Sequence, residues 1–587
     1  MRKYLMNRPA WPFKCASANF PSTGVFLFRS WVTCLGLAAV LGMGVSEKVN
    51  AATCPSGATC RYVSTSGNDS NSGSQSAPWK TLNYALSKTP AGGYIFLRRG
   101  DTWTIVSEGF EINKRNITLD AYGSGDKPVL SGNYYRYPAP SDWAPYRPAI
   151  RVGSENDQQS AEGTVVRNIE IKESGGECFR VYSQNTTLDS VFCNGSFGHG
   201  ISFRDYANDS KLINSVTYNH NFGAYGNKGS TLEVARHGLN IDLINNRHGF
   251  TGDKRRRKMQ CYSMWGSSSE LQACNGEAWG AANFTRALRT QFINNVVYGG
   301  WGEGVIVGCG GREALIDHVT VADGKVGIYL DGGSGSTISN SIVMGAGLSK
   351  YYRGSLAGPG IGLNREPYCL KQAENLGRAE NSSGVKIFNN IVTGRSQGLF
   401  FWAEVSTKYS SVKIYNNAFI NNEYAVAFAQ GEHVNTVVAN NMFIDTGADS
   451  KVKGLVKGFG SDKSGFIFKN NLWSYKPEIA ADYMAGSGTN SIISKDSGLS
   501  VKSGYFAINN DTFDHASWVS PEWVVSSNGA LKSAGYDLSK LNISYTKDLL
   551  GNKIGSSYPI GPLISGSVSI APPEPPPALK ATLIQAN

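Results

Sequence analysis

The sequence predicts an all-β protein, a parallel β-helix in which short strands and turns stack into successive coils. Three observations predict it. Paired polar residues recur along the chain at a period in the low twenties. The segments between the pairs, such as VKIFNN and GLFFWAE, are short and rich in β-branched or aromatic residues. Finally, no long segment shows the apolar spacing of an amphipathic helix.

The repeats run from about residue 165 to residue 473. The first polar residues of the pairs are Arg167, Asp189, Asn214, Asn245, Asn294, Asp317, Asn340, Asn389, Asn416, Asn440 and Asn470. Their successive spacings are 22, 25, 31, 49, 23, 23, 49, 27, 24 and 30 residues, so the period tolerates insertions. Asparagine tolerates the left-handed backbone of a sharp corner, and stacked asparagines can form a hydrogen-bonded ladder.

Residues 1–52 are typical of a secretory leader. Five basic residues precede the apolar run TCLGLAAVLGMGV, and VNAA provides a small-residue cleavage site before Thr53. The run is short for a membrane helix, although a retained anchor is the alternative. We therefore expect a secreted protein, extracellular or periplasmic, with no stable membrane span once the leader is removed.

The charge of the mature chain gives little information on partners. Removing residues 1–52 removes six basic residues and one acidic residue, which lowers the formal net charge from +11 to +6. A mildly basic surface is compatible with an acidic glycan, but an ordinary soluble surface is the simpler explanation. We expect a monomer that binds an extracellular polysaccharide and no nucleic acid.

The cysteines indicate disulfides. Eight remain after the leader, namely Cys54, Cys60, Cys178, Cys193, Cys261, Cys274, Cys309 and Cys369. An even number in an exported chain is typical of disulfide bonding. Closeness in sequence favours the pairs Cys54–Cys60 and Cys261–Cys274.

The first residues of the mature chain predict a cap. Residues 61–90 contain a strand, a polar Gly/Asn/Ser loop and a short amphipathic helix with Leu82, Ala85 and Leu86 on its apolar side. Such a helix covers the open end of the first coil, which would otherwise be an unpaired edge. The strand GGYIFLRRGDTW follows.

With these features the chain resembles the right-handed parallel β-helix, or pectate-lyase-like, superfamily. The cap is similar to that of secreted polysaccharide lyases of families 9 and 6. The resemblance implies a β-helix domain over residues 53–565 with loop insertions, followed by a flexible proline-rich tail over residues 566–587. It also implies an enzyme that acts on an extracellular polysaccharide.

Three loops are candidates for the walls of a site, because long loops in a solenoid usually have a function. Two are insertions, between Asn246 and Thr290 and between Ala346 and Gly384. The first contains a KRRRK cluster, which is either a patch for a polyanion or a solvated run of charge. The third, from Tyr134 to Pro148, is rich in aromatic residues and proline and is either a sugar-binding wall or a surface loop.

Equivalent positions in successive coils stack at about 4.8 Å, so they form a column. We aligned six strands that begin with glycine and found polar residues just after most of them. The predicted column contains Tyr182, Arg204, Asp205, Asn227, Lys228, Asp331, Asn364, Arg365 and Trp402. A polar column beside apolar strands favours a binding or catalytic role over mere packing.

This mixture suits cleavage of a uronate polymer by β-elimination. In the lyase families that the chain resembles, the base is a Lys or Arg whose pKa is lowered by burial and neighbouring cations. Lys228 is the first choice for this base and Arg204 the second. Asp205 and Asp331 are candidate Ca²⁺ ligands. Arg365, Arg236, Tyr182, Asn227 and Trp402 are candidate substrate-binding residues.

Other functions stay open. Glu303 and Asp331 are candidate paired carboxylates of a glycoside hydrolase. His220, His237 and His248 are candidate bases, as in a uronan epimerase, although a single histidine is more often structural. The chain lacks the aspartate cluster of the family 9 lyases and the Lys and Arg motifs of family 6, so no catalytic residue is transferred by motif. A non-catalytic carbohydrate-binding or surface protein is the third possibility.

Overall fold

The computed structural model describes most of the mature chain. The described residues are 53–105, 109–132, 147–157, 159–196, 199–218, 232–234, 240–249, 282–298, 303–322, 326–345, 358–378, 382–402, 407–428, 431–447, 452–458, 465–475, 491–494, 499–502, 522–525, 531, 533–555, 557–562 and 566–569. All of them belong to one compact unit, Ala51–Asn587.

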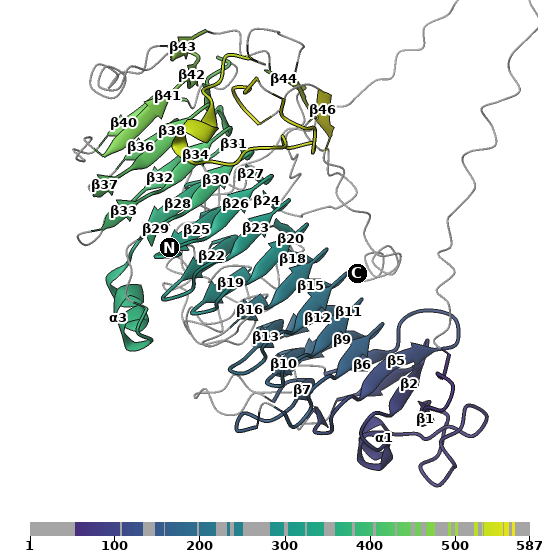
Figure 1. The fold of residues 1–587 in the computed structure, drawn as a ribbon. Helices are drawn as coiled ribbons and strands as arrows, with labels where there is room; N and C mark the ends of the chain where they lie inside the picture. Colours follow the sequence, from purple (N-terminus) through teal and green to yellow (C-terminus); the bar gives the residue numbers. More distant parts are fainter. Residues whose placement is uncertain are drawn as a thin grey trace, which may run out of the picture. The chain divides into compact units, whose positions relative to one another are not determined.

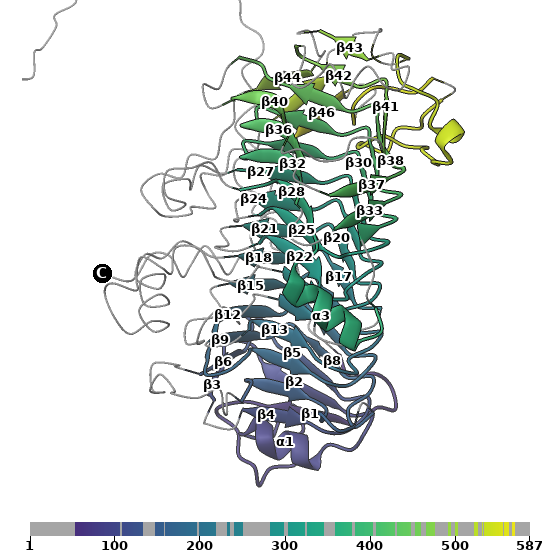
Figure 2. The same ribbon diagram turned by 90° about the vertical axis from the view of Figure 1, so that its left-hand side faces the viewer.

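Three long parallel sheets make up the described part of this unit (Figures 1 and 2). The first consists of β1 (Cys60–Val63), β2 (Tyr94–Arg98), β5 (Thr118–Tyr122), β8 (Val165–Arg167), β11 (Thr187–Asp189), β14 (Lys211–Ile213), β17 (Asp242–Ile244), β20 (Gln291–Ile293), β23 (Leu315–Asp317), β26 (Thr337–Ser339), β30 (Lys386–Phe388), β34 (Lys413–Tyr415), β38 (Thr436–Ala439) and β41 (Phe466–Lys469). The second consists of β3 (Thr102–Thr104), β6 (Val129–Ser131), β9 (Glu170–Ser174), β12 (Phe192–Ser196), β15 (Val216–Tyr218), β18 (Arg247–Gly249), β21 (Val296–Tyr298), β24 (Thr320–Ala322), β27 (Ile342–Met344), β31 (Ile391–Thr393), β35 (Ala418–Ile420), β39 (Met442–Ile444), β42 (Leu472–Trp473) and β43 (Ile492–Ile493). The third consists of β4 (Phe110–Ile112), β7 (Ile150–Val152), β10 (Phe179–Val181), β13 (Ile201–Phe203), β16 (Leu232–Val234), β19 (Ala282–Thr285), β22 (Val305–Gly308), β25 (Ile328–Asp331), β28 (Ile361–Asn364), β32 (Gln397–Phe401), β36 (Tyr424–Phe428) and β40 (Gly454–Gly458).

From β2 onward the chain visits the first, second and third sheet in turn, so each coil adds one strand to every sheet. This is the predicted parallel β-helix, and it begins before the repeats at residue 165. Alternate residues of each strand face the interior of the coils, where Leu188, Leu212 and Leu243 stack fully buried along the first sheet. Each such side chain stabilises the fold by about 1.5–3 kcal/mol through burial.

The corners after the first sheet are left-handed, as predicted for asparagine. In successive coils the residues with positive φ are Asn168, Ser190, Asn214, Asn245, Asn294, His318, Asn340, Asn389, Asn416, Asn440 and Asn470. The positions predicted at Arg167, Asp189 and Asp317 were wrong by one residue, because those residues end strands β8, β11 and β23.

The residue after each corner points into the coils and forms the predicted ladder in the last coils. The side-chain amide of Asn390 donates to Asn417 at 2.9 Å, that of Asn417 donates to Asn441 at 2.9 Å, and that of Asn441 donates to Asn471 at 3.1 Å. All four residues are buried. The ladder satisfies polar groups inside an apolar stack, where an unpaired amide would be destabilising.

Helix α1 (Leu82–Lys88) is the predicted cap. The side chain of Thr81 accepts a hydrogen bond from the Tyr84 amide at its N-terminus. Leu82 and Ala85 are buried, and Leu86 is partly buried against the same core. The helix therefore covers the first coils by its apolar side. No helix in the described ranges is long and apolar enough to cross a membrane.

Smaller elements complete the described chain. Helix α3 (Pro367–Asn375) precedes a short parallel sheet of β29 (Ser382–Ser383), β33 (Lys408–Ser410) and β37 (Glu432–Val434). An antiparallel sheet contains β44 (Leu499–Lys502), β45 (Glu522–Val525) and β46 (Gly566–Ser569), and a short 3-10 helix spans Leu538–Leu541. Strand β46 lies in the stretch that the sequence assigned to the tail.

Three disulfides join described cysteines. Cys54–Cys60 confirms a predicted pair, whereas Cys178–Cys193 and Cys309–Cys369 were not predicted. The predicted pair Cys261–Cys274 lies outside the described residues.

Candidate functional site

The third sheet has an outer row of side chains that alternates with the core residues. In order, the described members of this row are Glu111, Arg151, Arg180, Ser202, Asn283, Ile306, Tyr329, Gly362, Phe400, Ala427 and Lys457. The row changes in character along the coils. Its first three members are charged and part-exposed, its members from Ile306 to Ala427 are mostly apolar or aromatic, and Lys457 ends it.

Just past the third-sheet strands lies the column that the sequence singled out. Tyr182, Arg204, Gly308, Asp331, Asn364 and Trp402 occupy equivalent positions in their coils. The placement of Asn227 and Lys228 in this column was wrong. The third-sheet strand of their coil is β16, which begins at Leu232, so both residues precede the strand instead of following it.

Two arginines of this region share one buried carboxylate. Arg180 donates to Glu177 through Nη2 at 2.5 Å and through Nε at 3.1 Å. Arg204, one coil further on, donates to the same carboxylate at 3.1 Å. The Glu177 side chain is 3% exposed, whereas the side chains of Arg180 and Arg204 are 24% and 27% exposed. We name these three residues the Glu177 cluster.

The electrostatics of the Glu177 cluster favour an anion. Burial alone would raise the pKa of Glu177, but the two guanidinium groups outweigh burial and hold this pKa below its ordinary value. The carboxylate therefore stays ionised at neutral pH. One negative and two positive groups leave the cluster with a formal charge of +1, and both guanidiniums are within reach of solvent.

A second group of polar residues surrounds Asp331 and links three neighbouring segments. The backbone amide of Glu366 donates to Asp331 at 2.6 Å, and the hydroxyl of Tyr329 donates to the Glu366 carboxylate at 2.8 Å. The Asn364 amide donates to the Tyr329 hydroxyl at 2.9 Å. We name Tyr329, Asp331, Asn364 and Glu366 the Asp331 cluster.

The Asp331 cluster has a structural role. Asp331 and Asn364 are almost fully buried, and Asp331 holds the amide of Glu366, the N-cap residue of α3. The Cys309–Cys369 disulfide ties α3 to the coils beside it. Burial and the nearby carboxylates of Asp331 and Glu366 raise the pKa of Tyr329 far above its ordinary value, so this hydroxyl remains protonated and does not serve as a base.

Aromatic rings lie next to the Asp331 cluster. The ring centroids of Phe400 and Trp402 are 4.9 Å apart, and those of Tyr329 and Trp402 are 6.5 Å apart. Trp402, a predicted substrate-binding residue, thus belongs to an aromatic group on the outer side of the third sheet. Arg365, also predicted to bind substrate, follows Asn364 in the chain between β28 and α3.

The predicted pairing of Glu303 with Asp331 was wrong. Glu303 precedes β22, whereas Asp331 stacks on Gly308 at the other end of that strand. Five residue steps along the strand separate Glu303 from the position of Asp331 by about 17 Å. The two residues therefore do not provide the closely spaced carboxylates of a glycoside hydrolase.

The two predicted calcium ligands cannot share one ion. Asp205 follows β13 and Asp331 ends β25, four coils further along the third sheet, which is about 19 Å. Among the described residues, one group of three has donor atoms close enough for a metal, namely Cys309, Asp331 and Cys369. Two of these form a disulfide. This group therefore offers one carboxylate, whereas Ca²⁺ needs six to eight oxygen ligands.

The remaining candidates divide into two sets. His220, Asn227, Lys228, Arg236 and His237 lie outside the described residues. His248 lies on β18 and is fully buried, and its Nδ1 is 2.6 Å from the Thr217 hydroxyl. Burial lowers the pKa of His248 to about 3, so it is a neutral core histidine and not a general base.

Sequence reasoning missed Glu177, Tyr329 and Glu366. Glu177 contacts Arg204 across 27 residues, and Tyr329 contacts Glu366 across 37 residues. The alignment of glycine-led strands offered one signal for Glu177, because this residue lies two positions before strand β10, and the residues before the aligned strands were not considered.

The comparison with protein families decides the hand of the coils. A family described as "Right handed beta helix region" matches residues 278–472, which contain the coils from β19 to β41. The chain is a right-handed parallel β-helix protein. A second family, described as a protein of unknown function (DUF1565), matches residues 65–250 of this β-helix. No curated protein matches its sequence.

Solved structures with a similar fold include enzymes and sugar complexes. The pectate lyase Pel9A is 16% identical to this chain, with a TM-score of 0.39. The match covers 88% of this chain and 98% of the lyase. A PL6 alginate lyase in complex with a trisaccharide is 13% identical, with a TM-score of 0.45 over 76% and 90% of the two chains. XylC in complex with xylose is 10% identical, with a TM-score of 0.41. That match covers 87% of this chain and 100% of XylC. Similarity at this level supports no argument about activity.

Proposed function

We propose that this β-helix protein is an exported polysaccharide lyase that cleaves a uronate-containing glycan by β-elimination. One observation supports the proposal above the others. The Glu177 cluster presents two part-exposed guanidiniums, fixed by one buried carboxylate, with a net positive charge. A guanidinium matches the geometry of a carboxylate such as that of a uronate residue.

The chemistry needs such a site. In β-elimination a base removes the proton at C5 of the uronate, the bond from C4 to the leaving oxygen breaks as that oxygen takes up a proton from an acid or from water, and a C4–C5 double bond forms. Negative charge accumulates on the uronate carboxylate during proton removal, and a positioned guanidinium stabilises it. Because Glu177 fixes both arginines before substrate binds, little reorganisation is needed at that step.

The base belongs to a neighbouring coil in this proposal. Arg204 is ion-paired with Glu177, which stabilises its charged form, so we assign it to carboxylate binding instead of proton removal. Strand β16 lies next to β13 in the third sheet. The chain segments on either side of β16 contain Lys228 and His237, and Lys228 is our first candidate for the base.

The disulfides support export. Cys54–Cys60, Cys178–Cys193 and Cys309–Cys369 are typical of a protein that folds in an oxidising compartment. The basic and apolar pattern of residues 1–52 agrees with this inference. An extracellular polysaccharide is the partner that fits both observations.

The test is a panel of polyuronates incubated with the chain that begins at Thr53. Ultraviolet absorbance of unsaturated uronate reports elimination, and parallel reactions contain added Ca²⁺ or a chelator. We expect Arg180→Ala to lower turnover by about tenfold to a hundredfold. Lys228→Ala should lower it by about 10²-fold to 10⁴-fold. Arg289→Ala is the matched control, because Arg289 lies at a first-sheet corner beside Glu313.

Each outcome selects a function. A rise in absorbance on one polyuronate that Arg180→Ala slows by about tenfold or more supports the proposal. New reducing ends without that absorbance would instead indicate a hydrolase, and altered uronate stereochemistry without cleavage would indicate an epimerase. Binding without any reaction across the panel would favour a carbohydrate-binding protein.

A further inference from the structure

A histidine stacks on Glu177 in the next coil. Glu177 lies two positions before β10, and His199 lies two positions before β13, the neighbouring strand in register with β10. The Ser174 hydroxyl donates to the carbonyl oxygen of Glu177 at 2.7 Å, and the Ser196 hydroxyl donates to that of His199 at 3.0 Å. Ser174 and Ser196 also pair in register. The backbones of Glu177 and His199 are therefore one coil spacing apart, about 4.8 Å.

The turn that contains His199 is fixed by the fold. The Cys178–Cys193 disulfide ties the residue after Glu177 to β12, the strand that precedes this turn. The amide of Cys178 donates to the carbonyl oxygen of Gly200 at 2.8 Å. His199 is 7% exposed, so most of its ring is held within the wall of the coils. Its position therefore does not depend on a ligand, as is typical of a catalytic group.

His199 belongs to the electrostatic surroundings of the Glu177 cluster. Arg204 follows β13 in the coil of His199 and donates to the Glu177 carboxylate at 3.1 Å. Burial raises the pKa of Glu177, whereas Arg180, Arg204 and His199 lower it. The imidazole is therefore close enough to the carboxylate to act on its charge.

A uronate bound to the two guanidiniums by its carboxylate would have its leaving oxygen in the same place. Only C5 and C4 separate this oxygen from the carboxylate carbon. A group that protonates the oxygen must come within hydrogen-bond reach of it, and hence must lie beside the guanidiniums. His199 meets this requirement through its position one coil from Glu177.

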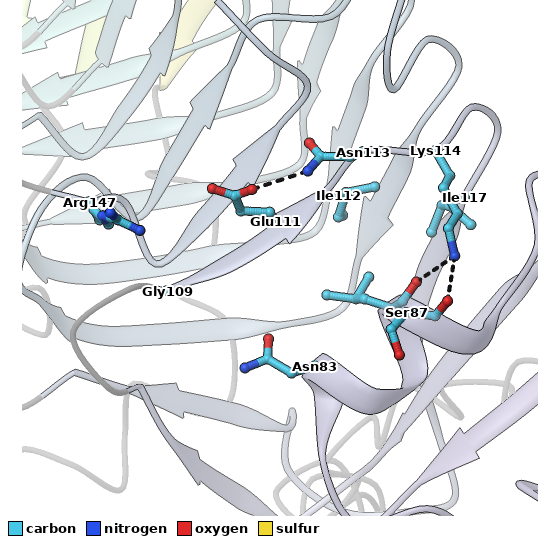
Figure 3. A pocket seen from close by; sticks show the side chains of 10 residues that line it. Asn83, Ser87, Gly109, Glu111, Ile112, Asn113, Lys114, Ile117 and Arg147 are labelled. Atoms are coloured by element: carbon cyan, nitrogen blue, oxygen red, sulfur yellow. Dashed lines mark hydrogen bonds between the residues drawn. The ribbon is translucent and has the colours of Figure 1, made fainter.

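The charged groups on the capped side of the cluster do not meet the requirement. Glu111 and Lys114 line a cavity of about 360 Å³ between α1 and β4 (Figure 3). Lys114 donates to three carbonyl oxygens at the end of α1, at 3.0, 2.8 and 2.7 Å, and Glu111 is ion-paired with Arg151 at 2.5 Å. Glu111 also lies two coil spacings, about 10 Å, from Arg180 along the outer row. Both groups are therefore engaged elsewhere and too distant for proton transfer.

Tyr182 is a second proton donor near the cluster, because it occupies the position of Arg204 one coil earlier. A phenol releases its proton less readily than an imidazolium does at neutral pH. A general acid is most effective when it exchanges protons near the operating pH. The chemistry therefore favours His199 over Tyr182.

We propose that His199 is the general acid that protonates the leaving oxygen at C4, an inference that rests on the proposed function. The base takes the C5 proton, and the electron pair of that C–H bond forms the C4–C5 double bond. The C4–O bond breaks with its electron pair on oxygen, which takes the N–H proton of the His199 imidazolium. The neutral imidazole and the protonated base then return to their starting states by exchanging protons with water.

The experiment compares two substrates of the chain from Thr53. One is an oligouronate with a sugar leaving group at C4, and the other has fluorine in place of the C4 glycosidic oxygen, since fluoride leaves without a proton. Absorbance of the unsaturated uronate reports both reactions. His199→Gln should slow the first reaction by about 10²-fold to 10⁴-fold and the second by less than about threefold, each relative to the unaltered chain.

Two further variants make the comparison specific. His318→Gln is the matched control, because His318 is paired with Asp317 at a first-sheet corner, and it should leave both reactions unchanged. Tyr182→Phe tests the second donor. Melting temperatures verify folding, and His199→Asn replaces His199→Gln if the glutamine variant does not fold.

Equal slowing of both reactions by a folded His199 variant, or unchanged turnover of the oligouronate, would overturn the inference. A difference between the two substrates in Tyr182→Phe, and not in His199→Gln, would assign the acid to Tyr182 and overturn it as well. Absence of elimination by the unaltered chain contradicts the proposed function and this inference together. Elimination that survives loss of His199 contradicts the inference alone.

Discussion

Two regions on the outer side of the third sheet have the same backbone geometry and opposite chemistry. Near β10 and β13, Arg180 of the outer row and Arg204 of the adjacent column share the buried carboxylate of Glu177. Near β25 and β32 the outer side presents the rings of Tyr329, Phe400 and Trp402. The repeated strands thus provide equal positions, and the side chains alone decide what each position does.

The difference also teaches how a buried acid can have two roles. Glu177 is buried between cations that face solvent, so it fixes groups that a ligand can reach. Asp331 is buried against the backbone amide of Glu366, so it fixes the start of α3. A buried carboxylate in a β-helix therefore indicates a site only when its partners remain accessible.

The largest expected effect comes from Glu177→Gln. Removing the charge leaves two guanidiniums facing each other, which should cost about 3–5 kcal/mol of the free energy of unfolding at neutral pH. The pKa of Glu177 is held below its ordinary value in the folded chain, so its contribution to stability is fully present above that ordinary value and is lost as the pH falls through the folded-state pKa. Urea denaturation of both proteins at several pH values measures the difference.

The control for that prediction is Arg289→Ala, which removes an exposed ion pair and should change the free energy of unfolding by less than about 1 kcal/mol. Equal stability of the Glu177→Gln variant and the unaltered chain at neutral pH would contradict the proposed electrostatics.

Asp331→Ala should have the next largest effect. The Glu366 amide loses its acceptor, at a cost of about 2 kcal/mol in the free energy of unfolding. Asp331→Asn retains an acceptor oxygen and should recover most of that stability. Thermal melts provide the measurement, and turnover of the Asn variant should stay near that of the unaltered chain. Loss of turnover without loss of stability would instead make Asp331 catalytic and erase the contrast between the two regions.

The smallest expected effect is that of Trp402→Ala. Its ring packs on Phe400, and its loss should weaken binding of a polyuronate by about tenfold at most, without changing the chemical step. Comparison of kcat and KM separates the two possibilities, and Trp402→Phe should recover most of the affinity. A large fall in kcat would show that the aromatic region contributes to catalysis and would contradict the division between the two regions.

Much of the fold was predictable because its determinants are local. The strand period, the amphipathic α1 and the Cys54–Cys60 disulfide all depend on residues close in sequence. The corner at Asn214 also follows from the preference of asparagine for positive φ. At Asp317 the same reasoning failed by one residue, because His318 occupies the corner and asparagine is absent there.

The sequence by itself therefore determined the β-helix, its cap and the position of Arg204 in a polar column. Only the tertiary structure decided that β16 is the third-sheet strand in the coil after β13, which removed Lys228 from the column. Only the tertiary structure, likewise, showed that Glu177 joins Arg180 to Arg204. The physical reason is that contacts between coils depend on the length of the chain between them. An insertion of unknown path changes which residues stack, while local preferences for strand, corner and helix remain the same.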